Sequence, residues 1–364
     1  MNILLITQED ILAGSTYSVS YLAKGLSARG HKVIVAARPG SVLHQILEKE
    51  PITFIPFTIP TRFHWASVRT LVRLVRQHQI QVINAQSSKD RYITVLARWF
   101  YRIPVLLIHT RRQVSMSVGG FFQNLVYVKG TDKIVAVSEG VKRSLIENRV
   151  PAQHIAVVYN GTPTEKYTAI NADVITELKA KFSIAVGDVV IGCISRRKKQ
   201  EQLLQSLDLI GKPVKVILVG IQEDEELEKI RANLTLPHQI FYEGEKEGAY
   251  ALNYYKIFTC TVLCSTIEGL SQGLLESMYL GTPVIATAAA GNIDLIKHNE
   301  NGLLFEDNDI GMLSANIQTI INDPKLREKL ISGGITTASD TFSIERTLTN
   351  YEKLYTELLT SHKN

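Results

Sequence analysis

Residues 258–278 read FTCTVLCSTIEGLSQGLLESM, and this stretch joins a buried strand to a helix. The run Phe258–Leu263 is apolar and β-branched, which is typical of a strand that is covered on both faces of a sheet. Ser271 is a good N-cap residue, and Leu274 and Leu275 give the helix that follows it a buried side. A buried strand that leads directly into a helix predicts a parallel α/β sheet.

The same alternation of apolar runs and helix-period segments extends along the whole chain. Helical segments such as Ser15–Arg29 and Val141–Asn148 separate the predicted strands of the first half, and similar segments separate those of the second half. The pattern predicts an α/β protein with two successive doubly wound parallel sheets. The predicted strands are Asn2–Ile6, Lys32–Ala37, Ile52–Phe57, Ile80–Asn84, Pro104–Ile108, Lys133–Val137, Ile155–Val158, Val189–Ser195, Val214–Val219, Gln239–Tyr242, Phe258–Leu263 and Pro283–Ala286.

We expect two domains, 1–165 and 166–344, joined by the polar stretch Thr162–Ala172. The tail 345–364 carries a helical face that must be buried against another element, and we expect it to pack back onto the first domain. That face is formed by Leu348, Tyr351, Tyr355 and Leu358. Ligands of such sheets bind outside the carboxyl ends of the strands, so a binding cleft is expected where the two domains face each other.

The composition is that of a globular enzyme rather than a disordered, collagen-like or disulfide-stapled chain. The 364 residues are 45% hydrophobic and 21% charged. No apolar run approaches the roughly 18 residues that a membrane-spanning helix needs. The segment Met1–Ile6 is short and lacks a basic flank, so we interpret it as a first strand rather than a signal peptide. These features predict a cytoplasmic location.

Two patterns that could suggest a metal site are better explained otherwise. The three cysteines Cys193, Cys260 and Cys264 do not have the spacing of a zinc site, and we expect them to be reduced thiols packed in the core. Asp307-Asn308-Asp309 matches a D-x-D pattern, but Asp309 precedes a predicted helix and fits an N-cap. We therefore expect no metal.

Charge is distributed unevenly between the two halves. Residues 1–165 contain 20 Lys and Arg against 9 Asp and Glu, whereas residues 166–364 contain 20 against 26. A basic half attracts anionic lipid, nucleic acid or an anionic small substrate, and its charge alone does not choose among them. No RNA-binding motif is recognisable, so we expect no nucleic-acid partner.

Two stretches of the basic half could lie on an anionic membrane surface. Arg69, Arg73 and Arg76 recur along one predicted helix, and residues 98–102 read RWFYR. Basic residues interleaved with aromatic ones are typical of segments that rest on lipid headgroups. An ordinary solvated helix beside a core-packed aromatic run explains the same pattern, and both alternatives remain open.

The second domain carries the strongest candidate site residues. Glu268 lies in the loop ahead of the helix that Ser271 caps, and Glu276 lies inside that helix. Carboxylates placed in this way can accept hydrogen bonds from polyol hydroxyls, while backbone amides at the helix start can bind phosphate. The basic run Arg196–Lys199 follows another strand, and it is either a phosphate-binding loop or a solvated one.

The first domain has weaker candidates at its strand ends. Gly14 stands in the turn Ala13–Thr16 after the first strand, where it can bring backbone close to an anion or simply form a tight turn. The segment 86–90, with Ser87 and Lys89, follows the fourth strand. His109 ends the fifth strand beside Arg111 and Arg112, where it can bind a ligand, move a proton or fill the core.

Together these motifs resemble the retaining glycosyltransferases of family 4, which have the GT-B fold of two Rossmann-like domains. Glu268 and Glu276, with seven residues between them, match the paired-glutamate motif of that family. The resemblance covers nearly the whole chain and is nearest to bacterial lipopolysaccharide-type sugar transferases. The other matching segments are Ser195–Lys199 with Leu203 and Leu204, Val137–Glu139, Val157–Gly161, Asn301–Phe305, Ser87–Asp90 and His109–Arg112.

The resemblance implies transfer of a sugar from a nucleotide-diphosphate sugar to an acceptor hydroxyl, with retention and without a metal or other cofactor. It implies that Glu276 holds the ribose, that Glu268 contacts the transferred sugar, and that His109 faces that sugar from the acceptor side. The donor-binding set it implies is Arg196, Lys199, Leu270, Ser271, Gln272, Glu276 and Gly14. We expect the acceptor, a surface glycan or glycolipid such as lipopolysaccharide core, to contact Ser87, Lys89, Arg111 and Arg112.

The chain departs from the family pattern at a few positions. Gln86 stands where many relatives carry histidine, and Gln200 stands where a glycine is usual. The functional position near the fifth strand is therefore either His109 or Arg112, and Lys198 competes with Lys199 as the phosphate ligand. Two other functions remain open: a GT-B sugar-nucleotide epimerase or phosphorylase, and a non-catalytic sugar-nucleotide-binding protein.

Overall fold

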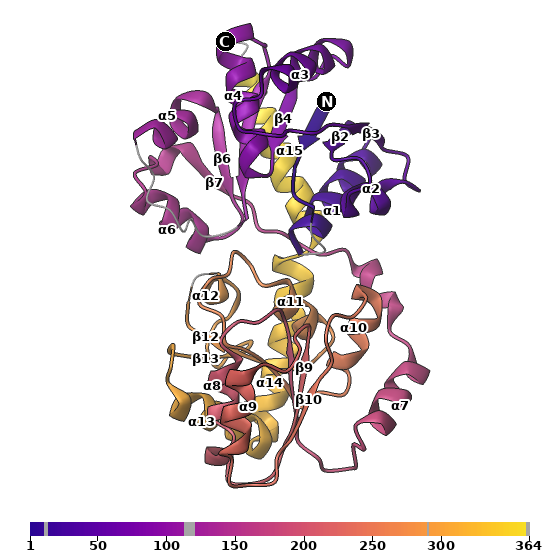
Figure 1. Ribbon diagram of the computed structural model, residues 1–364, viewed down its shortest axis with the longest axis vertical. Helices are drawn as coiled ribbons and strands as arrows, with labels where there is room; N and C mark the ends of the chain where they lie inside the picture. The colour runs from indigo at the N-terminus through magenta and orange to yellow at the C-terminus, as the bar shows by residue number, and fades with distance from the viewer. Residues whose placement is uncertain (11–13, 113–120, 290, 362–364) are drawn as a thin grey trace. The chain divides into compact units, whose positions relative to one another are not determined.

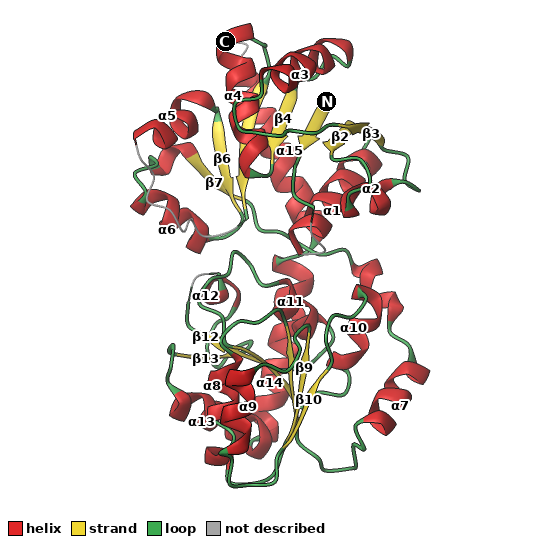
Figure 2. Cartoon of the chain, viewed as in Figure 1, coloured by secondary structure: helices red, strands yellow, loops and turns green. Residues whose placement is uncertain are grey.

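The computed structural model describes residues 1–10, 14–112, 121–289 and 291–361, with only the backbone for 121–124. The chain folds into two compact units, which are Met1–Thr162 with Ser343–Asn364, and Pro163–Phe342. Each unit is a parallel sheet with helices on both of its faces (Figures 1 and 2). The predicted α/β class with two doubly wound sheets is confirmed.

The first unit contains a seven-stranded sheet in the order β3-β2-β1-β4-β5-β6-β7. Every pair of neighbouring strands is parallel, and Ile3 of β1 lies between Val33 of β2 and Val82 of β4. The chain order reverses between β1 and β4, which is where open α/β sheets bind ligands. The strands are β1 Asn2–Ile6, β2 Lys32–Ala37, β3 Thr53–Pro56, β4 Val82–Ala85, β5 Leu106–Arg111, β6 Lys133–Ala136 and β7 Ile155–Val157.

Alternate residues of β1 anchor two separate cores. Ile3 and Leu5 pack with the helices α1, α2 and α15, whereas Leu4 and Ile6 pack with α3 and α4. A strand that is apolar at every position is needed because both of its faces are covered. The helices are α1 Gly14–Ala28, α2 Val42–Leu47, α3 Trp65–Gln77, α4 Ser88–Tyr101, α5 Phe121–Gly130, α6 Glu139–Glu147, η1 Ala152–His154 and α15 Ile344–Ser361.

Helix α15, at the end of the chain, belongs to the first unit (Figure 1). Tyr351 and Tyr355 are fully buried in the core that β1 and α1 share. Their hydroxyl groups are also satisfied, because Asn84 Nδ2 donates to the Tyr355 oxygen at 2.8 Å and the Thr110 hydroxyl lies 3.2 Å from that of Tyr351. The first sheet is therefore completed by residues that are more than 240 positions away in sequence.

The second unit contains a six-stranded parallel sheet in the order β10-β9-β8-β11-β12-β13, with the reversal between β8 and β11. Its last strand, β13, is not among the strands predicted from sequence; Leu303 pairs with Ile285 of β12. Three residues are too few for a recognisable strand pattern. The strands are β8 Val190–Ile194, β9 Lys215–Val219, β10 Gln239–Tyr242, β11 Cys260–Leu263, β12 Val284–Thr287 and β13 Leu303–Phe305.

Helices α8, α9 and α13 pack on one face of the second sheet, and α7, α10 and Tyr279 of α11 pack on the other. Asp309 caps α13 as predicted, accepting from the Met312 amide at 2.8 Å. Among the described residues, no helix is both long enough and apolar enough to cross a membrane. The helices are η2 Thr164–Ala169, α7 Ala172–Lys181, α8 Gln200–Gln205, η3 Asp208–Ile210, α9 Glu225–Ala232, α10 Gly248–Tyr255, α11 Gln272–Tyr279, α12 Asn292–Leu295, α13 Ile310–Asn322, α14 Pro324–Thr336 and η4 Thr337–Thr341.

Candidate functional site

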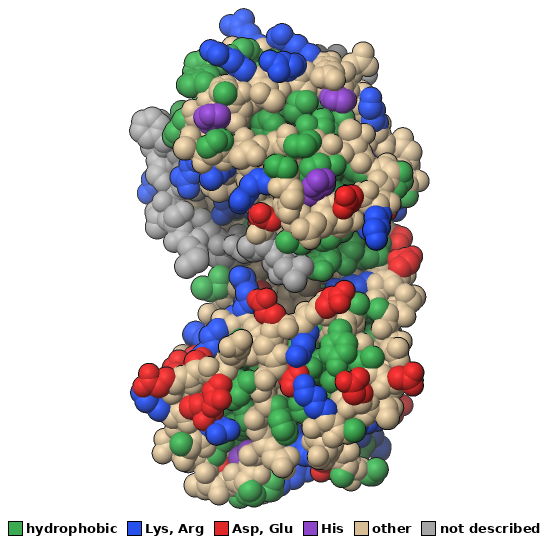
Figure 3. All heavy atoms as spheres, turned by 45° about the vertical axis from the view of Figure 1, so that its right-hand side comes forward, with side chains coloured by type: hydrophobic (Ala, Val, Ile, Leu, Met, Phe, Trp, Pro, Cys, Tyr) green, Lys and Arg blue, Asp and Glu red, His purple; other side chains and the backbone are tan. Residues whose placement is uncertain are grey.

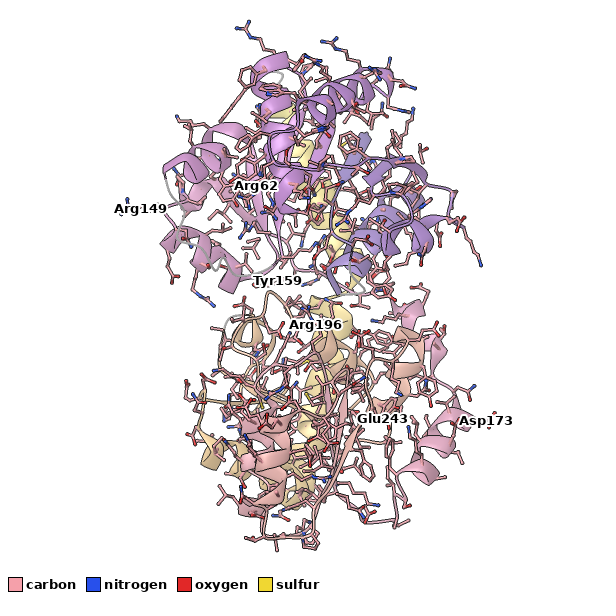
Figure 4. The ribbon with its side chains drawn as sticks, viewed as in Figure 1. Arg62, Arg149, Tyr159, Asp173, Arg196 and Glu243 are labelled. Carbon is pink, nitrogen blue, oxygen red and sulfur yellow. The ribbon has the colours of Figure 1, made fainter. Side chains whose placement is uncertain are left out.

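The strongest candidate residues lie at the point where the strand order of the second sheet reverses. The loop after β8 begins with Ser195 and carries Arg196, which Figure 4 labels at the end of the unit where α11 begins. The loop after the neighbouring strand β11 carries Glu268 and leads into α11. Two segments that are some 70 residues apart in sequence are thus brought together by the sheet.

Glycine allows the start of α11 to approach the end of β8 closely. A Cβ atom on Gly273 would lie 3.3 Å from the Ile194 carbonyl oxygen and 3.3 Å from the Tyr255 hydroxyl. Ser271 caps the helix as predicted, because its hydroxyl accepts from the Leu274 amide at 3.4 Å. Leu270 is buried in the loop just before the cap. The first turn of α11 thus lies beside the basic loop that follows β8.

Glu276 is held by a lysine and a tyrosine of the same unit. Lys166 Nζ donates to Glu276 Oε1, and the Tyr255 hydroxyl donates to Oε2 at 3.2 Å. The Glu276 side chain is 16% exposed and that of Lys166 is 19% exposed. Burial, and then the charge of Glu276, raises the pKa of Tyr255 well above its usual range, so this hydroxyl keeps its proton at neutral pH. The carboxylate is therefore anchored on two sides.

Lys166 is a site residue that the sequence analysis missed. It lies in η2, inside the stretch that was interpreted as a linker. The next residue, Tyr167, fixes this segment by stacking on Tyr279 of α11, with ring centroids 3.9 Å apart and an interplanar angle of 12°. The stacking partner lies 112 positions downstream of Tyr167 in sequence, so no local pattern could have found the contact.

Glu268 pairs with Lys198 and not with Lys199. Lys198 Nζ donates to Glu268 Oε1, and the Glu268 side chain is only 11% exposed. Lys199 Nζ instead lies 2.6 Å from Asp307 Oδ2. Of the two lysines left open by the sequence, the structure therefore brings Lys198 to the paired glutamates. Which of them binds phosphate stays a prediction.

The other cations of the basic loop differ in how they are neutralised. Arg197 is surrounded by acidic groups, with Asp224 and Glu226 oxygens both at 2.7 Å and Glu201 as a third partner. Arg196 is exposed and forms no ion pair with any residue that the structure describes. Four consecutive cations are thus tolerated because three have internal counter-ions, and Arg196 remains available to an anionic ligand.

Gln200 organises the basic loop. Its Nε2 donates to the Ser195 hydroxyl at 2.9 Å and to the Arg196 carbonyl at 2.8 Å. Its Oε1 accepts from the Lys198 amide at 2.6 Å and from Arg197 at 3.3 Å. Gln200 is 1% exposed, so it holds the loop from beneath rather than contacting a ligand.

In the first unit, the residues after β4 form a capping arrangement. Ser87 caps α4 together with Asp90, and its hydroxyl also accepts from the Gln8 amide at 3.0 Å. Lys89 is solvent-facing and donates to the Pro60 carbonyl at 2.9 Å. Ser87 and Lys89 therefore lie close in sequence but point to different neighbours. Gly14 begins α1 and is exposed, whereas Ala13 of the predicted turn lies outside the described residues.

His109 lies inside the first unit and not at its surface. The residue is fully buried, and its Nε2 is 3.4 Å from the Thr94 hydroxyl. Burial lowers the pKa of His109 well below its usual range, and the charges of Arg91 and Arg111 add to this effect. The ring of His109 therefore lies in the core beside α4 and not at the surface, and its role toward a ligand stays a prediction.

Arg111 is the last residue of β5 and Arg112 follows it, and their side chains contact different neighbours. Arg111 donates to the Tyr127 hydroxyl at 2.8 Å, and its guanidinium lies 5.7 Å from the centroid of that ring. Arg112 Nη2 donates to Gln86 Oε1 at 2.9 Å. Of the two candidates left open for the functional position near this strand, Arg112 is therefore the one that joins the residues after β4.

A separate surface of the first unit combines exposed aromatic and basic side chains. Trp65 of α3 and Phe100 of α4 are 45% and 63% exposed, and their rings meet edge to face with centroids 4.9 Å apart. Trp99 is also 40% exposed, whereas Tyr101 of the same run packs against the core. Figure 3 shows Lys and Arg side chains gathered beside hydrophobic ones on this unit. We call Trp65, Trp99 and Phe100 with the exposed Arg69, Arg73, Arg76 and Arg102 the aromatic–basic patch.

Two protein-family models match the chain, one in each unit. The model described as "Glycosyltransferase Family 4" matches residues 12–166. The model described as "Glycosyl transferases group 1" matches residues 176–337. The second match includes both paired glutamates and the whole basic loop.

Curated relatives point to the same enzymes. An uncharacterized glycosyltransferase of Methanocaldococcus jannaschii is 26% identical over 237 residues, which span 64% of this chain and 60% of that protein. The capsular polysaccharide biosynthesis glycosyltransferase CapM of Staphylococcus aureus is 25% identical over 80% of this chain and 81% of its own length. The lipopolysaccharide core biosynthesis glycosyltransferase LpsE of Rhizobium meliloti is 25% identical over 71% of this chain and 75% of its own length.

A solved structure shares the fold. The crystal structure of Anabaena HepE in complex with UDP superposes with a TM-score of 0.84 and 22% sequence identity, covering 98% of this chain and all of that chain. At this level of identity the similarity concerns the fold, in which two parallel-sheet domains follow each other along the chain.

Proposed function

The chain belongs to the family 4 glycosyltransferases of the GT-B type, and from this premise we propose that it moves a sugar from a nucleotide-diphosphate sugar to a hydroxyl group of a cell-surface glycan or glycolipid. One observation carries the proposal. Glu268 and Glu276 lie on either side of the start of α11, and each is partly buried and held by its own lysine. Two fixed carboxylates beside the start of a helix suit a ligand that has both hydroxyl and phosphate groups.

The donor is bound by the second unit in this proposal. Glu276 accepts hydrogen bonds from the two ribose hydroxyls, and Glu268 accepts from hydroxyls of the sugar to be transferred. The amides of Leu270, Ser271 and Gln272 receive the sugar and the phosphates. UDP is the nucleotide that we propose, since the similar HepE structure contains it.

Cleavage of the bond between the sugar and the diphosphate leaves negative charge on the departing diphosphate. Arg196, which has no internal counter-ion among the described residues, and Lys198, beside Glu268, can stabilise this charge together with the helix amides. Fixed cations in this position support a reaction that needs no metal ion. We further propose retention at the anomeric carbon, as the family resemblance implies.

The acceptor is proposed to bind to the first unit, and the aromatic–basic patch to hold that unit on an anionic membrane. Exposed Trp and Phe rings insert at the level of lipid headgroups, while arginines are attracted by anionic lipid. The names of CapM and LpsE support a surface polysaccharide or lipopolysaccharide as the product. Work at the cytoplasmic face of the membrane is consistent with such an acceptor.

The test is to incubate the purified chain with UDP-, GDP- and ADP-sugars and to follow both binding and turnover. We expect UDP to stabilise the fold, and slow hydrolysis of one UDP-sugar to release a sugar that NMR first detects in the anomeric form of the donor. Formation of an epimer would instead identify a sugar-nucleotide epimerase. Binding without any turnover, with or without extracted glycolipid, would identify a non-catalytic protein.

Two variants test whether the paired glutamates take part in the reaction. Glu268→Gln should lower turnover about 100-fold or more, since the transition state loses a contact to the sugar. Glu328→Gln is the matched control, because Glu328 is exposed on α14 and its charge change is the same. Equal turnover in the two variants would contradict the role of the paired glutamates.

A further inference from the structure

Buried polar atoms without a hydrogen-bond partner are concentrated at one place in the first unit. Seven such side-chain atoms occur among the described residues, and four of them are nitrogens of Gln86, Arg91 and Arg112. These are Gln86 Nε2, Arg91 Nε, and Arg112 Nε and Nη1. Burying an N–H group without a partner costs free energy, so a cluster of such groups requires an explanation.

The three side chains are joined to one another through Gln86. Arg112 Nη2 donates to Gln86 Oε1 at 2.9 Å, and Arg91 Nη2 donates to the Gln86 backbone oxygen at 3.3 Å. Gln86 is only 3% exposed, whereas Arg112 keeps part of its side chain at the surface. The cluster is therefore a built arrangement of buried donors, and Gln86 follows β4 at the strand-order reversal where α/β sheets bind ligands.

The positive charge of the cluster is only partly compensated, by the nearby carboxylates of Asp90 and Glu9. Arg91, Arg111 and Arg112 have no ion pair with any described carboxylate. Burial, and next the charge of Arg91, lowers the pKa of Arg111 to about 10. Asp90 is adjacent but accepts from the Gln86 and Ser87 amides, both at 2.9 Å, and Glu9 acts on Arg112 without forming an ion pair.

The buried side-chain atoms of Gln86, Arg91 and Arg112 that have no hydrogen-bond partner are all hydrogen-bond donors. A phosphate group offers only acceptor oxygens and carries close to two negative charges at neutral pH. Its three oxygens can occupy four spare nitrogens better than the two oxygens of a carboxylate can, and arginine binds phosphate as a fork. The chemistry of the cluster therefore selects a phosphate.

We propose that Gln86, Arg91 and Arg112 form a phosphate-binding subsite of the first unit, and that the acceptor brings a phosphate group to it. The identification of this phosphate as part of the acceptor rests on the proposed function, in which the donor is bound by the second unit. The subsite restricts the acceptor to phosphorylated glycans or phospholipid-linked glycans. An unphosphorylated sugar chain would leave the donors unpaired.

The test uses the full chain saturated with UDP, so that the donor site is filled, and measures the thermal shift produced by inorganic phosphate. Sodium acetate serves as the carboxylate probe, and sodium chloride at equal ionic strength serves as the salt control. We expect phosphate to raise Tm more than either. We expect Arg112→Gln to weaken the apparent phosphate affinity about ten-fold or more, through loss of charge-assisted hydrogen bonds.

Three further variants make the result specific. Arg112→Lys keeps the charge but not the fork, and should bind phosphate with intermediate affinity. Arg346→Gln removes an exposed arginine of α15 in the same unit and should bind as the unmodified chain does. Gln86→Met removes the Gln86 amide donor without changing Arg112. If Arg112→Gln fails to fold, a weaker apparent phosphate affinity of Gln86→Met tests the subsite instead. Arg112→Gln without phosphate should be at least as stable as the unmodified chain, because a buried cation without a counter-ion has been removed.

The outcomes separate the subsite from the proposed function. If UDP binds and phosphate protects no better than chloride, or protects Arg112→Gln equally, the subsite is refuted while the proposed function stands. If acetate protects as well as phosphate, the assignment to phosphate is wrong. If UDP itself does not bind, the proposed function fails, and phosphate protection measured without UDP still decides whether the subsite exists.

Discussion

Lys166 Nζ and Glu276 Oε1 form an ion pair between two residues that are 110 positions apart, and both side chains are mostly buried. The pair joins the segment that enters the second unit to the helix that carries the candidate site. Because Tyr255 holds the other oxygen of Glu276 from beneath, the carboxylate is fixed before any ligand arrives. A fixed acceptor loses less conformational entropy when a ligand binds.

Replacement of Glu276 should affect both donor binding and stability. We expect Glu276→Gln to weaken UDP binding about ten-fold, since a charged acceptor of ribose hydroxyls becomes a neutral one. The free energy of unfolding should fall by about 1–3 kcal/mol, because Lys166 loses the negative charge of Glu276 in a partly buried position. Titration calorimetry and urea denaturation measure the two effects. An unchanged UDP affinity would remove Glu276 from the donor site.

Gln200 should act on the donor through the loop that it supports. We expect Gln200→Leu to raise the KM for the donor several-fold while kcat changes little, because Arg196 and Lys198 lose their fixed positions and not their charges. Gln205→Leu is the matched control, since Gln205 is exposed on the same helix. A fall in kcat at unchanged KM would show that Gln200 does not act by positioning the loop.

His109 should be dispensable for the chemistry. It is fully buried, and its lowered pKa keeps it neutral at pH 7. We expect His109→Leu to keep kcat within about two-fold while stability changes by about 1–2 kcal/mol, as is usual for a core substitution. A loss of turnover of 100-fold in a folded variant would restore His109 as a catalytic candidate.

Asp90 should make stability depend on pH. Burial raises its pKa to about 6 from the 3.8 of an exposed aspartate. The folded state therefore takes up a proton at a higher pH than the unfolded state does, so acidification from pH 7 to pH 4 should stabilise the chain by up to about 3 kcal/mol relative to Asp90→Asn. Urea denaturation of both proteins across this range measures the difference. A difference that is constant with pH would contradict the raised pKa.

The aromatic–basic patch should bind anionic vesicles. We expect the full chain to float with phosphatidylglycerol-containing vesicles and not with pure phosphatidylcholine vesicles. Trp65→Ala with Phe100→Ala should reduce this binding about ten-fold, through the loss of inserted apolar area. The control replaces Leu209 and Met312, which are exposed in the second unit, with alanine. Equal flotation of both double variants would exclude the patch.

The fold was predictable from sequence because its strands are buried on both faces. Continuous apolar, β-branched runs such as Asn2–Ile6 and Val214–Val219 are the pattern that a covered parallel strand requires. The strand β13 was missed since Leu303–Phe305 is too short to show any periodicity. The long strands and helices can therefore be predicted from the pattern of apolar residues. The three-residue edge strand β13 forms because it pairs with β12.

Sequence could indicate the paired glutamates but not their partners. Glu268 and Glu276 lie near a recognisable helix cap, which is a local feature. The choice between Lys198 and Lys199 depends on the backbone, because Lys199 has a φ of 58° in the left-handed region and so directs the two side chains apart. The burial of His109 could not be predicted for a related reason: one residue near the end of a strand does not reveal which face of the sheet it occupies.

Because α15 packs on the first sheet, the first unit cannot be completed until the end of the chain has been synthesised. The second unit is continuous from Pro163 to Phe342, so it has all of its residues before the ribosome reaches α15. The first sheet, whose opening strand is made at once, still lacks the rings of Tyr351 and Tyr355 at that time. The half of the protein that emerges first is consequently the half that finishes last.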